Sequence, residues 1–79
     1  MAKTKLQWFP IEEMDLEDGT HTAYWTPDPK SKDYWYTITQ LADGTWDVEL
    51  STKRYSGVYT TMVNCKTLTS AKRWAARYL

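Results

Sequence analysis

The stretch YWYTITQLADGTWDVEL, residues 34–50, predicts a β-hairpin that organises the rest of the fold. In its second half Trp46, Val48 and Leu50 alternate with acidic residues, which is typical of a strand with one buried face. Between the two halves lies an Asp-Gly pair at 43–44, a frequent turn signal in hairpins. We therefore expect two antiparallel strands whose apolar side chains share one face.

Two registers of the hairpin are compatible with this turn. A two-residue turn pairs Ile38 with Glu49 and places the apolar residues of the first strand on the polar face. A longer loop, with Gly44 in the left-handed conformation, pairs Ile38 with Val48 and gathers the apolar residues on one face. We expect this second register. Its other pairs are Tyr36 with Leu50 and Leu41 with Thr45.

Shorter strands are expected on both sides of the hairpin. A weak alternation over residues 6–9 ends at Pro10 and indicates a short edge strand. Residues 12–19 are mostly acidic and are expected to form a loop or a single helical turn. Further strands are expected at residues 21–26 and 58–65, with a turn signal at 55–57.

The last element is a helix that begins within residues 67–70 and runs to Leu79. Thr69 or Ser70 is the expected N-cap, because a hydroxyl there can accept a hydrogen bond from a backbone N–H. At about 100° per residue, the apolar residues of the helix fall within an arc of about 140°. This predicted face holds Ala71, Trp74, Ala75, Tyr78 and Leu79, and the cations Lys72, Arg73 and Arg77 lie opposite.

Together these elements predict an α+β fold, an antiparallel sheet of four to five strands with one C-terminal helix packed on one face. The length of 79 residues fits a single domain, residues 1–79. A chain this short has a thin core, so aromatic rings are expected to supply much of its buried area. The expected core is Trp46, Val48, Leu50, Tyr36, Ile38, Ala71, Trp74, Ala75 and Tyr78.

Charge is segregated along the chain although the net charge is zero. Residues 1–50 carry all ten carboxylates and four lysines, whereas residues 51–79 carry six cations and no carboxylate. A surface that meets a charged partner explains such a division. Lys72 adds to this expectation, since a cation near the start of a helix opposes the helix dipole. The candidate partner-binding residues are Glu12, Glu13, Asp15, Glu17 and Asp18 in an acidic segment, and Lys53, Arg54, Lys72, Arg73 and Arg77 in a basic one.

Few residues suit catalysis or metal binding. His21 and Cys65 are each the one residue of their type. A lone histidine in a strand is more often a surface or packing residue than a base, and one His with one Cys falls short of the four ligands of a zinc site. The carboxylates at 15–18 do not follow the spacing of a calcium loop. We therefore expect a non-enzymatic protein with no cofactor.

Two classes of partner remain. The chain has twelve aromatic residues, more than so small a core holds, so several are expected at the surface, where Trp and Tyr are typical anchors for a protein partner. The alternative is a nucleic acid, because the cations of residues 51–79 alternate with aromatic residues that can stack on bases. The zero net charge favours the protein partner. A homodimer also remains open.

The sequence also bears on localisation. No apolar run reaches the length of a signal peptide or a membrane span. One unpaired cysteine agrees with a reducing compartment. We therefore expect a cytoplasmic protein with no membrane partner.

Three stretches carry a resemblance to small phage and prophage proteins: residues 36–38, 43–48 and 67–75. They match a strand, a D-G-x-W hairpin and a T-L-x-x-A-K helix start. The resemblance implies a phage accessory protein in the host cell cytoplasm that binds and inhibits or redirects a host protein, including CRISPR and other defence components. The order of strands and helix is also similar, more weakly, to the arm-type DNA-binding domains of tyrosine integrases, which implies the nucleic-acid alternative.

Overall fold

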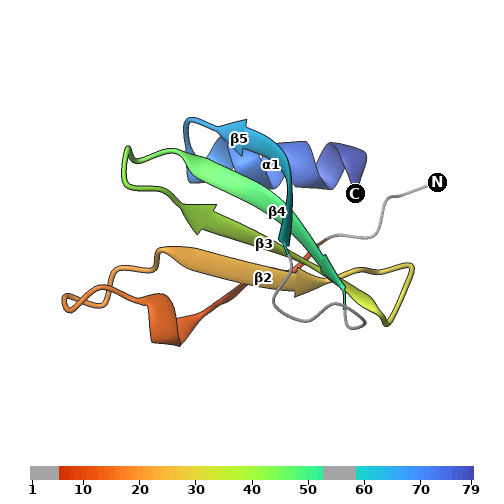
Figure 1. Cartoon of the computed structure of the whole chain (residues 1–79), viewed down its shortest axis with the longest axis horizontal. Coiled ribbons are helices and arrows are strands. Elements are labelled where there is room, and N and C mark those ends of the chain that lie inside the picture. The colour runs from red at the N-terminus through yellow and green to blue at the C-terminus, as the bar shows by residue number, and fades with distance from the viewer. Residues whose placement is uncertain (1–5, 53–58) are drawn as a thin grey trace.

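The computed structural model describes residues 6–52 and 59–79, which form one five-stranded antiparallel sheet and one α-helix (Figure 1). The strands lie in the sheet in their chain order, so each pairs with its neighbour in sequence. This confirms the predicted α+β fold. The elements are β1 (Phe9–Pro10), the 3-10 turn η1 (Glu12–Met14), β2 (Ala23–Pro27), β3 (Tyr34–Gln40), β4 (Trp46–Thr52), β5 (Tyr59–Cys65) and α1 (Leu68–Tyr78).

The hairpin of β3 and β4 has the register expected for the longer loop. A backbone hydrogen bond of 2.7 Å from Leu41 to Thr45 closes the loop. Gly44 has φ +87°, a left-handed conformation that a residue without a Cβ adopts without strain. The Asp43 carboxylate accepts hydrogen bonds from the hydroxyl and the backbone N–H of Thr45, which hold the pKa of Asp43 below its ordinary value. The predicted pairs Ile38 with Val48, Tyr36 with Leu50 and Leu41 with Thr45 are all confirmed.

The shorter strands differ from prediction by a few residues at their ends. The edge strand is Phe9–Pro10 rather than residues 6–9, because its order comes from pairing with β2. Phe9 lies opposite Trp25, and the two ring centroids are 5.3 Å apart. Pro10 is tolerated at the sheet edge, where it needs no N–H for a further strand. The turn predicted at 55–57 lies outside the described residues.

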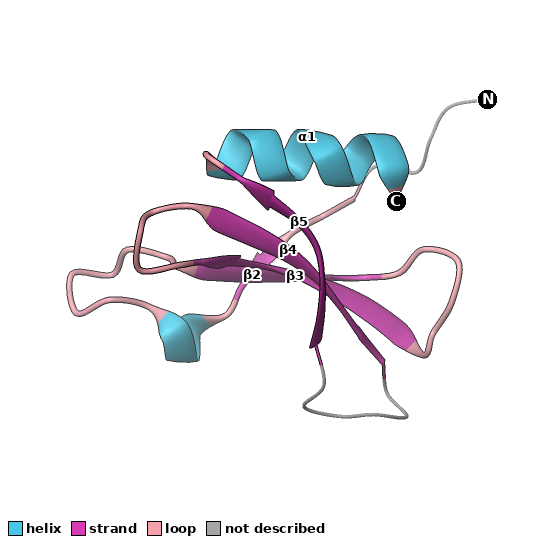
Figure 2. Ribbon diagram, turned by 45° about the horizontal axis from the view of Figure 1, so that its top comes forward, coloured by secondary structure: helices cyan, strands magenta, loops and turns pink. Residues whose placement is uncertain are grey.

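The core lies between α1 and one face of the sheet (Figure 2). Its centre is a buried cluster of Ile38, Trp46, Val48 and Ala71. Of the other predicted members, Tyr36 and Ala75 are buried, and Leu50 and Trp74 are half-buried. Tyr78 is 61% exposed, so its predicted place in the core is wrong.

Tyr78 is exposed although it lies within the arc of α1 that packs on the core. At about 100° per residue, the residues of α1 that are buried or packed against the core span about 140°, and Tyr78 falls inside this span. Tyr78 is in the last turn of α1, where its ring lies against the Trp74 ring, with centroids 5.2 Å apart and the ring planes tilted by 41°. The packed stripe is Leu68, Ala71, Trp74, Ala75 and Leu79.

The helix begins at Leu68, within the predicted range 67–70, but its N-cap is not one of the two predicted residues. Its N-cap is Thr67, whose hydroxyl accepts a hydrogen bond of 3.1 Å from the backbone N–H of Ser70, so the predicted caps at 69 and 70 are wrong. Leu68 is the first helical residue, which makes Lys72 the fifth rather than the third. Because the helix dipole acts mainly within the first turn, Lys72 opposes it little.

Alternation along the strands divides the sheet side chains between two faces. One face packs under α1, which contacts β4 and β5. Among residues 6–52 and 59–79, α1 is the only α-helix, so the other face carries no α-helical layer (Figure 2). We call it the open face. From the strand register it holds Phe9, Ala23, Trp25, Pro27, Trp35, Thr37, Thr39, Asp47, Glu49, Ser51, Tyr59, Thr61 and Asn64.

Candidate functional site

The predicted acidic segment joins β1 to β2, at one edge of the sheet. Two of its carboxylates hold the local chain together. Asp15 pairs with His21, with 2.9 Å between Oδ1 and Nδ1. Asp18 accepts hydrogen bonds from the hydroxyl and backbone N–H of Thr20, which keep the pKa of Asp18 below its ordinary value. Glu12, Glu13 and Glu17 are exposed, as is Asp18.

The predicted cationic residues lie on α1 or outside the described residues. The Lys72 Nζ lies 4.9 Å from the centroid of the Tyr24 ring, and its side chain is half-buried. A cation over an aromatic ring is itself stabilising, so Lys72 has a role within the fold. Arg73 and Arg77 are exposed. Lys53 and Arg54 lie outside the described residues.

The two charged surfaces do not meet in the described part of the chain. Strand order places the acidic segment beside β1 and β2, whereas α1 contacts β4 and β5 at the opposite edge. No ion pair joins the acidic segment to Lys72 or Arg73 there. The separation of the two charged segments is partial, because Lys72 reaches the Tyr24 ring in β2, the strand that follows the acidic segment.

The open face carries an aromatic cluster that the sequence did not single out. Trp25 is 39% exposed, Tyr59 is 51% exposed and Phe9 is 38% exposed. Trp35, next to them in the register, is half-buried. Large rings at this exposure bury substantial area when a partner covers them, which is why such residues dominate binding energies.

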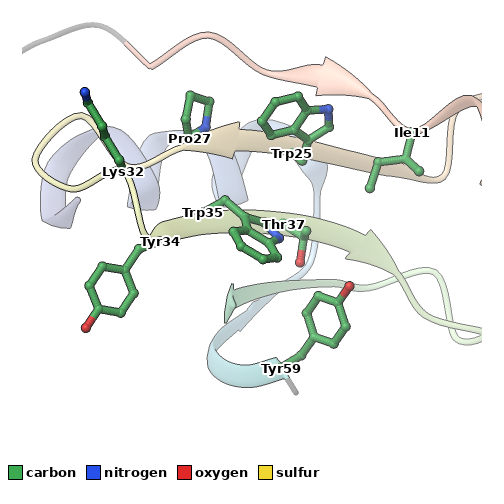
Figure 3. A pocket seen from close by; sticks show the side chains of 8 residues that line it. All are labelled: Ile11, Trp25, Pro27, Lys32, Tyr34, Trp35, Thr37 and Tyr59. Atoms are coloured by element: carbon green, nitrogen blue, oxygen red, sulfur yellow. The ribbon is translucent and has the colours of Figure 1, made fainter. Parts of the chain in front are cut away.

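Of these rings, Trp25, Trp35 and Tyr59 line a hollow of about 470 Å³ (Figure 3). Strand β2 contributes Trp25 and Pro27, and β3 contributes Trp35 and Thr37, on the same side of the sheet. No sequence signal predicted a hollow of this size in so small a domain. Its complete lining is Ile11, Trp25, Pro27, Lys32, Tyr34, Trp35, Thr37 and Tyr59.

One polar atom in this lining lacks a partner. Thr37 is 4% exposed, and its Oγ1 makes no hydrogen bond with any described residue. A buried hydroxyl without a partner costs about 1–3 kcal/mol. Such groups are few in folded proteins, and a ligand is one of the things that can satisfy them. Because Oγ1 itself has almost no accessible surface, a group that enters the hollow can pair with it only after neighbouring side chains move.

Carboxylates lie beside the hollow on the open face. Glu49 is opposite Thr37 in the register, and Asp47 is two residues further along β4. Burial raises the pKa of Glu49, a hydrogen bond with Thr39 opposes this, and the nearby Asp47 raises it further. Asp47 accepts a hydrogen bond of 2.7 Å from Asn64. The open face is thus aromatic toward one end and acidic toward the other.

The sequence held a partial signal for this site. Alternation puts Trp35 and Thr37 on the face opposite Ile38, so the hairpin alone indicated a second face with one tryptophan. Placing Trp25 and Tyr59 beside them required the registers of β2 and β5. The irregularity between Val48 and Glu49 shifts the β5 register by one residue, and no sequence signal marks it.

Metal and membrane signals are missing from residues 6–52 and 59–79. No group of three or more His, Cys, Asp or Glu there can hold a metal ion. Nor is any helix in those ranges long and apolar enough to cross a membrane. Comparison of the chain with protein-family models, curated proteins and solved structures gives no match. The fold and the open face together define the class of this protein, a small α+β domain with an uncovered aromatic surface.

Proposed function

We propose that this chain is a non-enzymatic binding protein that docks a protein partner on the open face. The observation that carries the proposal is the ring of exposed aromatic side chains around the unpartnered hydroxyl of Thr37. A partner that covers the hollow gains buried aromatic area and can supply the missing hydrogen bond. The proposal assigns no catalysis and no cofactor to the chain.

The resemblance to small phage proteins supports a narrower version of the proposal. The chain would then be a phage-encoded protein that inhibits or redirects a host protein in the host cytoplasm, including a defence component such as CRISPR. A small domain with one large binding face suits that role, because inhibition by binding needs only a surface that blocks the partner.

A protein partner fits the open face better than a nucleic acid does. Asp47 and Glu49 lie on this face, and both would repel the phosphates of a strand stacked on the aromatic rings. Lys32 is the one cation that lines the hollow. A nucleic-acid platform needs cations along the backbone path, and this face lacks them within the described residues.

A nucleic acid is the second candidate, and it would bind at α1. Arg73 and Arg77 are exposed one helical turn apart, and the exposed ring of Tyr78 lies beside them. If this candidate is correct, oligonucleotide affinity falls log-linearly with salt, by roughly one unit of slope per phosphate contact. No binding of single-stranded or duplex oligonucleotides at low salt removes it.

Partner capture tests the proposed function. A tagged chain is used to capture proteins from a host lysate, beside the variants Trp25→Ala and Tyr59→Ala. We expect each variant to reduce recovery of a specific partner about tenfold or more, the usual effect of removing an aromatic anchor. The matched control is Tyr78→Ala, which removes an exposed ring from α1 and should leave capture unchanged.

Circular dichroism and the thermal midpoint establish that each variant is folded. The opposite pattern would contradict the proposal: capture retained by Trp25→Ala and Tyr59→Ala, and lost by Tyr78→Ala.

A further inference from the structure

We propose that the partner presents a basic extended segment, with an apolar side chain in the hollow and an arginine or lysine against Glu49 and Asp47. This inference rests on the proposed function and adds the chemistry of the partner. It is carried by three observations: the order of side chains across the open face, the environment of its carboxylates and the size of the face.

The first observation is that the open face changes character row by row. The first row across the sheet is Pro27, Trp35, Ser51 and Tyr59; the second is Trp25, Thr37, Glu49 and Thr61; the third is Ala23, Thr39, Asp47 and Asn64. Successive rows are two residues apart, or about 7 Å. The apolar anchor and the cation of the partner therefore need to be about 7–14 Å apart, the span of a few extended residues.

The second observation concerns the carboxylates. Neither Glu49 nor Asp47 forms an ion pair with any residue in the described ranges. Glu49 is half-buried, and burial is the main cause of its raised pKa. A carboxylate in this position is stabilised by an incoming cation more than a fully solvated one is.

Arginine suits the site especially well. A guanidinium can stack on a tryptophan face and donate two parallel hydrogen bonds to a carboxylate. Trp25 and Glu49 occupy the same row, with Thr37 between them. Both kinds of contact are therefore within reach of one planar side chain.

The surroundings of the open face set the direction of the segment. Lys32 lines the hollow beside the aromatic row, so the cation of the partner belongs at the opposite end, near Asp47. Ile11, which also lines the hollow, is held beside this end of the open face. Its backbone N–H donates a hydrogen bond of 2.9 Å to the carbonyl of Ala23, which lies in the same row as Asp47. The exposed Glu12 and Glu13 follow directly and extend the negative surface.

The third observation is the small size of the face. Five strands at about 4.8 Å and seven residues at about 3.3 Å give roughly 20 Å in each direction, or about 400 Å². A standard protein interface uses about 800 Å² from each partner. An extended segment fits this area, whereas a second copy packed face to face would bring like carboxylates together.

Peptide binding tests the inference. The probe is fluorescein-labelled octa-arginine that begins with one leucine as the apolar anchor. Octa-glutamate that begins with the same leucine and a deca-thymidine oligonucleotide are the comparisons, and binding is followed by fluorescence anisotropy. We expect saturable binding of octa-arginine only, weakened about tenfold by the double variant Asp47→Asn with Glu49→Gln. The matched control is Glu17→Gln with Asp33→Asn, which removes two exposed carboxylates from outside the open face and should change the affinity less than threefold.

Three outcomes would overturn the inference: no saturable octa-arginine binding, equal weakening by both double variants, or binding of either comparison probe that depends on the open face. Partner capture separates this failure from failure of the proposed function. If Trp25→Ala abolishes capture while Asp47→Asn with Glu49→Gln does not, the docking face stands and the basic segment is wrong. If neither affects capture, both are wrong.

Discussion

Thr37 shows, for a single residue, how the open face differs from the core. Its neighbour along β3, Ile38, is fully buried on the helix side, where it packs in the apolar cluster. Thr37 is nearly as buried on the other side, but its hydroxyl lacks a partner among the described residues. Valine, which has the same shape, would avoid that cost. On the proposed function, a threonine here favours binding at the expense of stability.

The variant Thr37→Val tests this reading. Because it removes a buried hydroxyl without changing the side-chain shape, we expect the free energy of unfolding to rise by about 1 kcal/mol. Partner capture should weaken at the same time. Urea denaturation measures the first effect and capture the second. The matched control is Thr61→Val, an exposed position on the open face, which should leave stability within about 0.5 kcal/mol. A less stable Thr37→Val variant with full capture would contradict the reading.

At the scale of elements, the helix start shows which local signal decides a boundary. Thr67, Thr69 and Ser70 all have hydroxyls that can cap a helix. Thr67 is the cap because it is extended, with φ −133° and ψ 158°, and because capping there brings Leu68 into the packed stripe. Packing of one leucine thus selects among equivalent caps.

The variants Thr67→Ala and Thr69→Ala distinguish the caps. We expect Thr67→Ala to lower the free energy of unfolding by about 0.5–2 kcal/mol, because the N–H of Ser70 loses its acceptor. Thr69 is exposed in the first turn, so Thr69→Ala should change the free energy of unfolding by less than about 0.5 kcal/mol. Chemical denaturation measures both. Equal losses from the two variants would show that the helix begins later than Thr67.

The hairpin was predictable in detail because two independent constraints agree on one register. The loop requires a left-handed glycine at Gly44, and the alternation requires Ile38 opposite Val48. The helix face was predictable in its rotation about the axis, because Ala71, Trp74, Ala75 and Leu79 are buried or packed against the core. Its extent along the axis was not predictable, since periodicity alone does not show that Tyr78 in the last turn is exposed.

At the scale of the whole molecule, a two-layer domain with one helix covers only one face of its sheet. The helix-side face carries the buried cluster built around Ile38, Trp46 and Val48, whereas the open face carries the exposed rings of Phe9, Trp25 and Tyr59 together with Asp47 and Glu49. The charge division of the sequence gives a basic helix at one edge and an acidic segment at the other. The sequence predicted that aromatic and charged surfaces exist, but their arrangement depends on registers between strands distant in sequence.

Binding of the partner to the open face is best tested by NMR of the nitrogen-15-labelled chain, recorded with and without the unlabelled captured partner. If the partner binds the open face, the indole N–H signals of Trp25 and Trp35 and the amide signal of Thr37 shift or broaden. Those of Trp46 and Trp74, on the helix side, should stay in place and serve as internal controls. Perturbation of the Trp74 indole and the Arg73 and Arg77 amides, with Trp25, Trp35 and Thr37 unchanged, would contradict the account and place the partner on α1.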